Sequence, residues 1–494
     1  MTRPGTWILL AALAAPVPAR AQALPPIDTL ALRGHTFFLS HDLLEGRETG
    51  SRGDEVAARY LAAAAERLGL AGGAAGGAWL QEVPVVEATV DAPATSLSLS
   101  DSSGTRTFGT PSWFLPNGGT AAALAGFGGE LAWVVDASFV LSHPTALPPL
   151  AGRVAVMAGV FGADAMAADT LAARGATGVI EVVGDDDAYA LYARSRGPTR
   201  MYLADSAAVS SFEPSLPAVV VRGALARAML PRLDAPAQLE RPFPMAGRRV
   251  AVVIRTRTRP LLAHNVVALL RGGDPARRGE IVAYTAHHDH LGIGEPDARG
   301  DTIYNGFTDN AAGCAALLAI AQALVARRPA RSALFVFFTG EERGLLGSDW
   351  FVAHPPMPLA ALAAVINLDA GAPPGRPVRW HVTGGDRTTL GAVATDVARA
   401  QGWAVETRPP SPNTDYFPFL RLGVPAVFLV PAPGAYEGLS LDSSNALRRR
   451  WDHYHEPADE WSADYPFAGL ARYAEFALRL GLALSEGARP RLAR

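Results

Sequence analysis

The second half of the chain alternates long apolar runs with segments of helical periodicity. Apolar runs that lack polar alternation are typical of strands buried on both faces of a sheet. Between two of them, the spacing of apolar positions predicts a helix over 310–327. The pattern therefore predicts an α/β fold with a mixed, mostly parallel sheet flanked by helices on both faces. The apolar runs are EIVAYTAH (280–287), SALFVFFTG (332–340), AAVINLDAG (363–371), VRWHVTGG (378–385) and PAVFLVP (425–431).

The first half of the chain has shorter elements. Residues 54–68 predict an amphipathic helix that places Val56, Tyr60, Ala64 and Leu68 on one stripe. Between about 125 and 245, short apolar runs alternate with helical segments, which indicates a small α/β domain inserted into the larger one. We therefore predict an N-terminal part of the main domain at 24–120, an inserted domain at 121–248, and the rest of the main domain at 249–494.

The first residues have the pattern of a secretory signal peptide. Arg3 precedes an apolar run from Trp7 to about Ala15, and the segment ends in Ala21-Gln22-Ala23. This pattern predicts a signal peptide at 1–23, cleavage after Ala23 and export to the periplasm or the medium. The alternative is a retained anchor, although the apolar run is shorter than the roughly 20 residues that a bilayer requires. We expect no later segment to span a membrane.

Composition excludes several classes of function. The chain has 494 residues, is 49% hydrophobic and carries a net charge of −3, so it has apolar material for a large core but no basic footprint for nucleic acid. It contains no lysine, which excludes lysine-dependent pyridoxal enzymes and P-loop ATPases. Its single cysteine, Cys314, forms no intramolecular disulfide and fits a small core position on the predicted helix.

Ionisable residues gather where the predicted strands end. Because loops at the carboxyl ends of parallel strands converge, we expect these residues to share one edge of the sheet. Any one of them alone could be a capping residue, but five loops that each bring an imidazole or a carboxylate favour a metal site. The residues are His287, His288, Asp289 and His290, then Asp309, then Glu341 and Glu342, then Asp369, and finally Tyr454 and His455.

A mixed set of imidazoles and carboxylates suits zinc. Five ligands are too many for one tetrahedral ion with an open position, but they fit two ions that share a bridging carboxylate. Such a pair lowers the pKa of a shared water and requires a nearby base. We therefore predict two Zn²⁺ ions as cofactors, with cobalt or manganese as alternatives in the same site.

Five motifs of the second half of the chain, in their order along it, resemble those of peptidase family M28, a family of co-catalytic zinc aminopeptidases and related exopeptidases. The segment SHDLLEGRETGSRGDEVAARYLAAAAERLGL also resembles that family's opening segment, and 125–245 resembles the protease-associated domain that many members carry. The resemblance implies a zinc exopeptidase fold with an inserted protease-associated domain. The motifs are AHHDHLG (286–292), TDNAAG (308–313), TGEERGLLGS (339–348), INLD (366–369) and YHEPADE (454–460).

The resemblance also assigns metal ligands. It implies that His287 and Asp369 bind one zinc ion, that Glu342 and His455 bind the other, and that Asp309 bridges the two. These assignments agree with the number and kind of ligand that two zinc ions need.

Three further roles follow from the resemblance. Glu341 would be the general base, and Tyr454 would direct its hydroxyl at the oxyanion that forms on attack. Asp289 would fix the ring of His287, a role that is also plausible from the residues alone.

Other polar residues near these motifs receive lesser roles. We interpret His288 and His290 as residues of the site wall and His453 as a weaker rival to His455. The segment 413–417 resembles a family loop beside the substrate, and a capped turn before a buried Phe is the alternative.

The predicted function is that of an exported di-zinc metallopeptidase that hydrolyses the N-terminal peptide bond of peptides. Two alternatives remain open. The same metal centre would serve another amide hydrolase, such as a carboxypeptidase or a cyclase, and the fold could also survive as a non-catalytic binding ectodomain.

Overall fold

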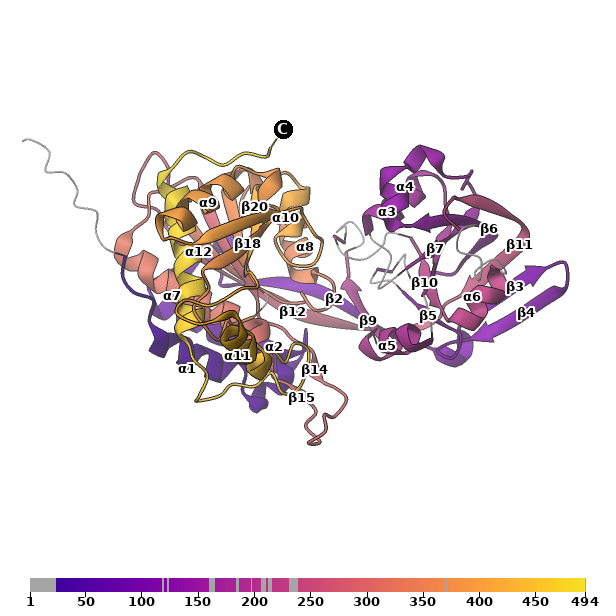
Figure 1. Cartoon of the computed structure of the whole chain (residues 1–494), viewed down its shortest axis with the longest axis horizontal. Coiled ribbons are helices and arrows are strands. Elements are labelled where there is room, and N and C mark those ends of the chain that lie inside the picture. Colours follow the sequence, from indigo (N-terminus) through magenta and orange to yellow (C-terminus); the bar gives the residue numbers. More distant parts are fainter. Residues whose placement is uncertain are drawn as a thin grey trace, which may run out of the picture.

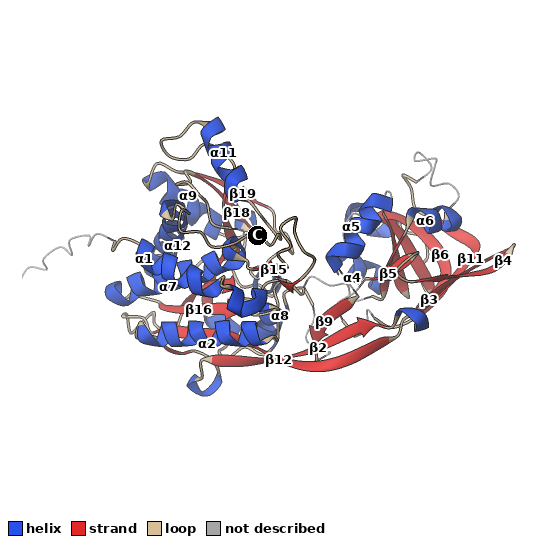
Figure 2. Cartoon of the chain, turned by 90° about the horizontal axis from the view of Figure 1, so that it is seen from below, coloured by secondary structure: helices blue, strands red, loops and turns tan. Residues whose placement is uncertain are grey.

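The computed structural model describes residues 24–117, 120–121, 124–159, 165–183, 186–196, 198–205, 210–211, 216–230, 239–369 and 371–493. These residues form two lobes, each built around its own sheet (Figures 1 and 2). The predicted signal peptide at 1–23 lies outside the described residues.

The larger lobe contains a mixed sheet with helices on both faces, which confirms the predicted fold class. Its strands follow the order β19-β18-β20-β17-β13-β16-β12-β2-β9, and β1 pairs with β12. The centre, from β20 to β16, is parallel, while β12, β2 and β9 are antiparallel. The strands are β1 (Ala71–Gly72), β2 (Leu80–Val90), β9 (Thr199–Leu203), β12 (Thr256–Leu270), β13 (Ile281–His287), β16 (Ser332–Phe338), β17 (Leu362–Leu368), β18 (Arg379–Thr383), β19 (Ala404–Arg408) and β20 (Ala426–Pro431).

The central strands are apolar on both faces because both faces are covered. In β13, Val282 and Tyr284 join the core on one side, while Ile281 and Ala283 join the core on the other. The first core includes residues of α1 (Thr29–Leu39), α2 (Arg52–Arg67), α7 (Ala312–Arg327), α9 (Leu390–Ala400) and α12 (Ala468–Glu486). The second includes residues of α8 (Leu346–Ala353) and α10 (Phe417–Arg421). This double cover leaves the strand ends as the place where polar loops gather.

The segment Phe307–Arg327 ends in the central helix of the larger lobe. Among the described residues it alone is long and apolar enough to cross a membrane, and 83% of its most apolar window is buried inside the protein. The expectation that no segment after residue 23 spans a membrane stays a prediction, although this segment is longer and more apolar than the sequence analysis allowed. Its apolar character reflects packing, since α7 lies against α1 and α12 and against the sheet.

Helix α2 buries most deeply a stripe beside the predicted one. Ala57, Ala58, Leu61 and Ala65 are buried in the core, while Tyr60, Ala64 and Leu68 of the predicted stripe pack against it and are partly buried. The prediction is wrong for Val56, which is exposed, because it followed the larger side chains, while alanines allow close packing against β12.

The start of α2 packs closely against the turn Asp42–Arg47. A Cβ atom at Gly53 would lie 1.8 Å from the carbonyl oxygen of Leu44. We therefore expect Gly53→Ala to lower the free energy of unfolding by about 1–3 kcal/mol, measured by urea denaturation. The matched control is Gly34→Ala in α1, where nothing lies within 4 Å and the change should stabilise by up to about 1 kcal/mol. Equal effects of the two changes would contradict the packing described here.

The smaller lobe is built on an eight-stranded sheet of order β4-β3-β11-β6-β7-β8-β10-β5. This sheet begins at β3, so the predicted boundary at 120/121 lies inside it, and β9 belongs instead to the sheet of the larger lobe. The likeness of this lobe to a protease-associated domain stays a prediction. The strands are β3 (Ser96–Asp101), β4 (Gly104–Gly109), β5 (Phe114–Pro116), β6 (Phe127–Asp136), β7 (Arg153–Ala158), β8 (Gly178–Val182), β10 (Ala218–Val221) and β11 (Phe243–Val253), with α3 (Ala137–Ser142), α4 (Ala165–Ala173), α5 (Asp186–Arg196) and α6 (Gly223–Met229).

Residues 210–211, which follow β9, contact the larger lobe at a buried carboxyl group. Ser211 donates from its backbone nitrogen and its hydroxyl to Asp349 of α8, at 2.7 and 2.5 Å. Arg421 donates to the carbonyl of Ser210 at 3.0 Å. Burial outweighs these bonds and raises the pKa of Asp349 to about 7.

This pKa predicts a pH dependence of stability. Between about pH 4 and pH 7 the folded state keeps a proton on Asp349 that the unfolded state has released, so stability falls as pH rises through that window. The fall is at most about 1.4 kcal/mol per pH unit. Asp349→Asn should flatten it, which urea midpoints at about pH 5 and about pH 8 would show. An unchanged slope in the variant would contradict the assignment.

Candidate metal centre

Five loops of the larger lobe meet at one edge of its sheet. His287 ends β13, Glu341 and Glu342 follow β16, and Asp369 follows β17. Asp309 precedes α7, and His455 follows α11 (Leu441–Trp451). All eight predicted site residues lie in this region, and the side chains of six of them form two adjacent clusters, with Asp289 and Tyr454 beside them.

The first cluster surrounds His287, whose side chain is fully buried. Its Nε2 atom lies 3.1 Å from Asp309 Oδ1 and 3.3 Å from Asp369 Oδ1. The other oxygen of Asp369 accepts a hydrogen bond from the hydroxyl of Thr414. Glu341 belongs to this cluster as well, since one of its oxygens lies within 4.8 Å of donor atoms of His287 and Asp369.

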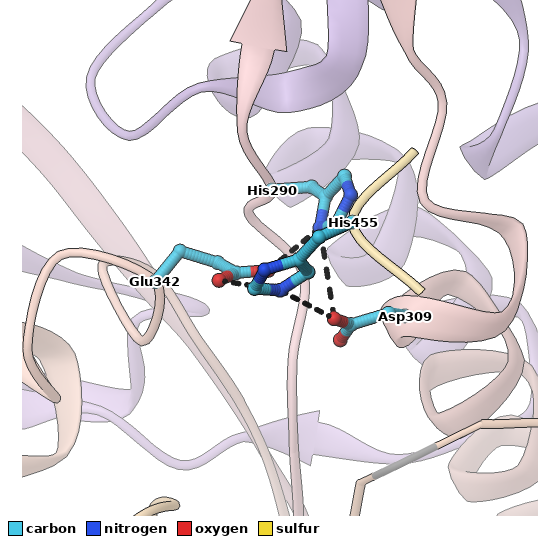
Figure 3. Close-up of side chains that lie close together, drawn as sticks. All are labelled: His290, Asp309, Glu342 and His455. Carbon is cyan, nitrogen blue, oxygen red and sulfur yellow. Dashed lines mark hydrogen bonds and ion pairs between the residues drawn. The ribbon is translucent and has the colours of Figure 1, made fainter. Parts of the chain in front are cut away.

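The second cluster surrounds His455 and is drawn in Figure 3. Its Nε2 atom lies 3.1 Å from Asp309 Oδ2 and 3.2 Å from Glu342 Oε2. The remaining oxygen of Glu342 lies 2.7 Å from His290 Nδ1. Glu342 therefore presents Oε2 to His455 while His290 holds Oε1.

Asp309 connects the two clusters, with one carboxylate oxygen facing His287 and the other facing His455. Its position is fixed by Asp459, whose carboxylate accepts hydrogen bonds from the backbone nitrogens of Thr308 at 3.0 Å and Asp309 at 3.2 Å. The segment that supplies His455 thus also supports the loop of Asp309.

Asp289 lies behind the first cluster. Its carboxylate accepts hydrogen bonds from Thr49 Oγ1 at 2.9 Å and from the backbone nitrogen of Glu341 at 3.2 Å. His287 Nδ1 lies 3.2 Å from the backbone oxygen of Asp289 and 3.6 Å from its carboxylate. Asp289 therefore links the segments of His287 and Glu341, and its backbone oxygen lies closer to the imidazole than its carboxylate does.

Tyr454 stands at the mouth of the site. Its ring stacks on that of His455, with centroids 3.8 Å apart, and 61% of the residue is exposed. Desolvation of the hydroxyl, together with the carboxylates of Asp309 and Glu342, raises the pKa of Tyr454. The phenol therefore stays protonated at ordinary pH and can donate a hydrogen bond.

His288 and His290, interpreted from the sequence as residues of the site wall, lie in the segment that follows His287. Both are buried, because the chain turns inward after β13. His288 Nε2 lies 3.0 Å from Asp54 Oδ1 of α2, and His290 holds Glu342. His453, the predicted rival of His455, lies 3.4 Å from Glu456 and is in neither cluster.

The sequence did not predict that His290, Thr414 and Asp459 support the metal-binding residues. The motifs that contain His290 and Asp459 had been recognised, but their partners, Glu342 and the Asp309 loop, are distant in sequence. Thr414 lies in the segment 413–417, where its bond to Asp369 gives this loop a contact with the site. Only the fold brings these pairs together.

The electrostatics of the two clusters are those of crowded, buried charges. Burial alone lowers the pKa of His287, but Asp369 and Glu341 outweigh it and raise the pKa well above the ordinary value. Burial likewise lowers the pKa of His455, but Asp309 and Glu342 outweigh it and raise the pKa to about 10. Burial raises the pKa of Glu341 well above its usual range, and Asp369 and Glu342 raise it further.

The donor set fits a pair of zinc ions. Donor atoms bound to a tetrahedral zinc ion at 2.0–2.1 Å lie roughly 3.3 Å apart. In the first cluster, His287 Nε2 lies 3.1 and 3.3 Å from its two carboxylate oxygens. In the second, His455 Nε2 lies 3.1 and 3.2 Å from its two carboxylate oxygens. His455 Nε2 is buried and has no hydrogen-bond partner of good geometry among the described residues. A cation that binds there takes this nitrogen's lone pair in place of the proton.

Comparisons with known proteins agree with this geometry. Residues 265–480 match the sequence profile described as "Peptidase family M28". This region of the chain is therefore similar to peptidase family M28, in line with the resemblance seen in the motifs.

Curated relatives match over short stretches. Over 91 residues the chain is 36% identical to a "probable leucine aminopeptidase 2" of Aspergillus oryzae. This alignment covers 18% of this chain and 16% of that protein. Over 110 residues it is 33% identical to a "Probable zinc metalloprotease" of Pyrenophora teres f. teres. That alignment covers 22% of this chain and 23% of the relative. The chain thus spans less than a quarter of either relative in these alignments.

A solved structure shares the fold over nearly the whole chain. It is an "Aminopeptidase from Aneurinibacillus sp. strain AM-1", with a TM-score of 0.55, 17% identity and 95% coverage of each chain. At this identity the likeness supports the architecture of both lobes and carries no residue roles.

Proposed function

We propose that the protein is an exported di-zinc metallopeptidase that removes the N-terminal residue from peptides. The observation that carries the proposal is the pair of clusters that share Asp309, with donor separations that match the edge of a zinc tetrahedron. The family match and the aminopeptidases among its relatives support the reaction class.

The residues divide between two ions. His287 and Asp369 would hold one zinc ion, Glu342 and His455 the other, and Asp309 both. When bound, two such ions supply Lewis-acid polarisation of the scissile carbonyl and lower the pKa of a water. The donor set contains no cysteine, because Cys314 points its thiol at the carbonyl of His287 and away from the donor atoms.

Glu341 would act as the general base. It takes a proton from the attacking water as the C–O bond forms, and it passes that proton to the leaving amine when the peptide C–N bond then breaks. Its carboxyl lies beside the first cluster, and Asp289 holds its backbone nitrogen. Burial raises the pKa of Glu341, which makes its carboxylate a stronger base.

Tyr454 would stabilise the oxyanion that forms on the substrate. Its hydroxyl remains a donor because its pKa is raised, and its ring is fixed by stacking on His455. A donor in this position contributes most when the carbonyl oxygen becomes negatively charged. Because the ring is exposed at the mouth of the site, a substrate can reach it.

The experiment combines zinc analysis of the purified protein with a panel of aminoacyl anilides. We expect two zinc ions per chain, release of aniline from substrates with a free amine, loss of turnover with a chelator and recovery with added zinc. The matched controls are N-acetylated anilides, which an aminopeptidase leaves intact, and N-blocked dipeptides, which a carboxypeptidase cleaves. Turnover that a chelator does not affect, or less than one zinc ion without turnover, would contradict the proposal.

A further inference from the structure

Arg47 lies in the motif EGRETGSRG and is among the largest fully buried side chains of the protein. Its guanidinium donates to four backbone carbonyls. Nε bonds to His288 at 2.7 Å, Nη1 to Asn305 at 2.7 Å and to Leu39, and Nη2 to Gly306 at 3.0 Å. The backbone oxygen of Arg47 in turn accepts a hydrogen bond from the nitrogen of His290 at 3.1 Å.

These contacts join three separate segments of the chain. One is the end of α1, one is the loop that follows β13, and one is the loop that leads to α7. The second segment supplies His287, and the third supplies Asp309 three residues after Gly306. Arg47 therefore connects the backbone next to His287, which belongs to the first cluster, with the backbone near Asp309, which both clusters share.

The surroundings show that this arrangement leaves little freedom. A Cβ atom at Gly46 would lie 2.5 Å from the carbonyl oxygen of Gly292, and one at Gly306 would lie 2.6 Å from the ring of His290. The turn that carries Arg47 is thus wedged between the two loops. Asn305 closes the third side, since its amide donates to the carbonyl of Ser40 at 3.0 Å and to Asp42 at 2.8 Å.

A buried arginine that bonds to carbonyls rather than to a carboxylate requires charge balance from nearby groups. Burial lowers the pKa of Arg47, while Asp289 and Asp309 are among the groups that oppose this. Arginine keeps its charge in proteins, and its planar fork of donors can serve several carbonyls at fixed angles. A lysine offers one nitrogen in its place and cannot reach all three segments.

We propose that Arg47 is the positioning residue of the metal centre: it fixes the separation of the His287 and Asp309 segments and so sets how tightly the site holds zinc. The proposal rests on the proposed function only in that zinc is the ion of the site. Residues that support metal ligands from behind typically change metal affinity about 10–100-fold when they are altered.

The chain offers a matched control in Arg331. This arginine is also buried, and its Nη1 atom donates to the carbonyls of Leu484, Ser485 and Gly487, but it lies at the start of β16, at the opposite end of that strand from Glu341. Arg331 Nε also donates to Glu280 at 2.6 Å, an ion pair that a lysine can keep, so Arg47→Lys and Arg331→Lys are alike in that each removes carbonyl hydrogen bonds of a buried guanidinium. Only the carbonyls that Arg47 contacts lie behind the metal centre.

The test compares the zinc dissociation constants of wild type, Arg47→Lys and Arg331→Lys, measured by competition with a chromophoric chelator, with the melting temperatures of the metal-free proteins. We expect both variants to melt at lower temperature, while Arg47→Lys alone weakens zinc binding roughly tenfold or more. Equal zinc constants for the two variants would overturn the proposal, because they would show a role in folding stability alone.

A milder variant keeps the test decisive if Arg47→Lys does not fold. Asn305→Ala removes two hydrogen bonds from the loop that Arg47 holds and leaves the arginine in place. We expect it to weaken zinc binding roughly threefold or more, and an unchanged constant would overturn the proposal. Failure of the proposed function is distinguishable, since it would appear as absent turnover in a wild-type protein that still binds zinc.

Discussion

Glu341→Gln is expected to abolish peptide hydrolysis while the zinc content stays at the wild-type value. The amide has nearly the same shape as the carboxyl group, but it cannot accept the proton of the attacking water. Loss of a general base typically costs about 10²–10⁴-fold in rate. Glu341 shares the first cluster with His287 and Asp369, but those two residues and Asp309 make the short imidazole–carboxylate contacts, so the ligand set survives the change.

The measurement is kcat on an aminoacyl anilide together with zinc analysis of the same sample. Glu66→Gln, on the exposed face of α2, is the matched control and should leave both values unchanged. An active Glu341→Gln variant would remove Glu341 from its role as base. A variant that loses zinc would instead make Glu341 a ligand.

Asp309→Ala is expected to remove both zinc ions and with them all turnover. Each carboxylate oxygen of Asp309 faces a different histidine, so one substitution takes a ligand from both clusters. Loss of a shared ligand should weaken zinc binding by more than the roughly 10–100-fold seen for supporting residues. Because ligand binding stabilises the folded state, added zinc should raise the melting temperature of wild type but not of the variant.

The measurement is zinc stoichiometry, with melting curves recorded with and without added zinc. Asp442→Ala, at an exposed position of α11, is the matched control and should behave as wild type does. Retention of two zinc ions by the Asp309→Ala variant would rule out a bridging role.

The sequence predicted the strands and the edge at which the site forms. The apolar runs of β13, β16 and β17 were recognisable because burial on both faces leaves no polar alternation. The rule that ligands gather at the carboxyl ends of parallel strands then placed the ionisable residues together. The structure joins Asp369, His287, Asp309, His455 and Glu342, in that order, by four imidazole–carboxylate contacts.

Contacts between distant segments could not be predicted in the same way. Nothing local in the sequence pairs Arg47 with the carbonyls of His288 and Gly306, because backbone groups carry no sequence signal. The most deeply buried stripe of α2 was not predicted for a related reason, since alanines that pack closely against a strand carry little hydrophobic contrast. The boundary of the smaller lobe was misplaced because β3 pairs with β11, about 150 residues later in the chain.

The most direct test of the shared metal centre is an anomalous difference map of zinc-loaded crystals, recorded at the zinc absorption edge. We expect two peaks, one beside His287 and Asp369 and the other beside Glu342 and His455, with Asp309 in contact with both. A single peak, or peaks that Asp309 does not touch, would contradict it.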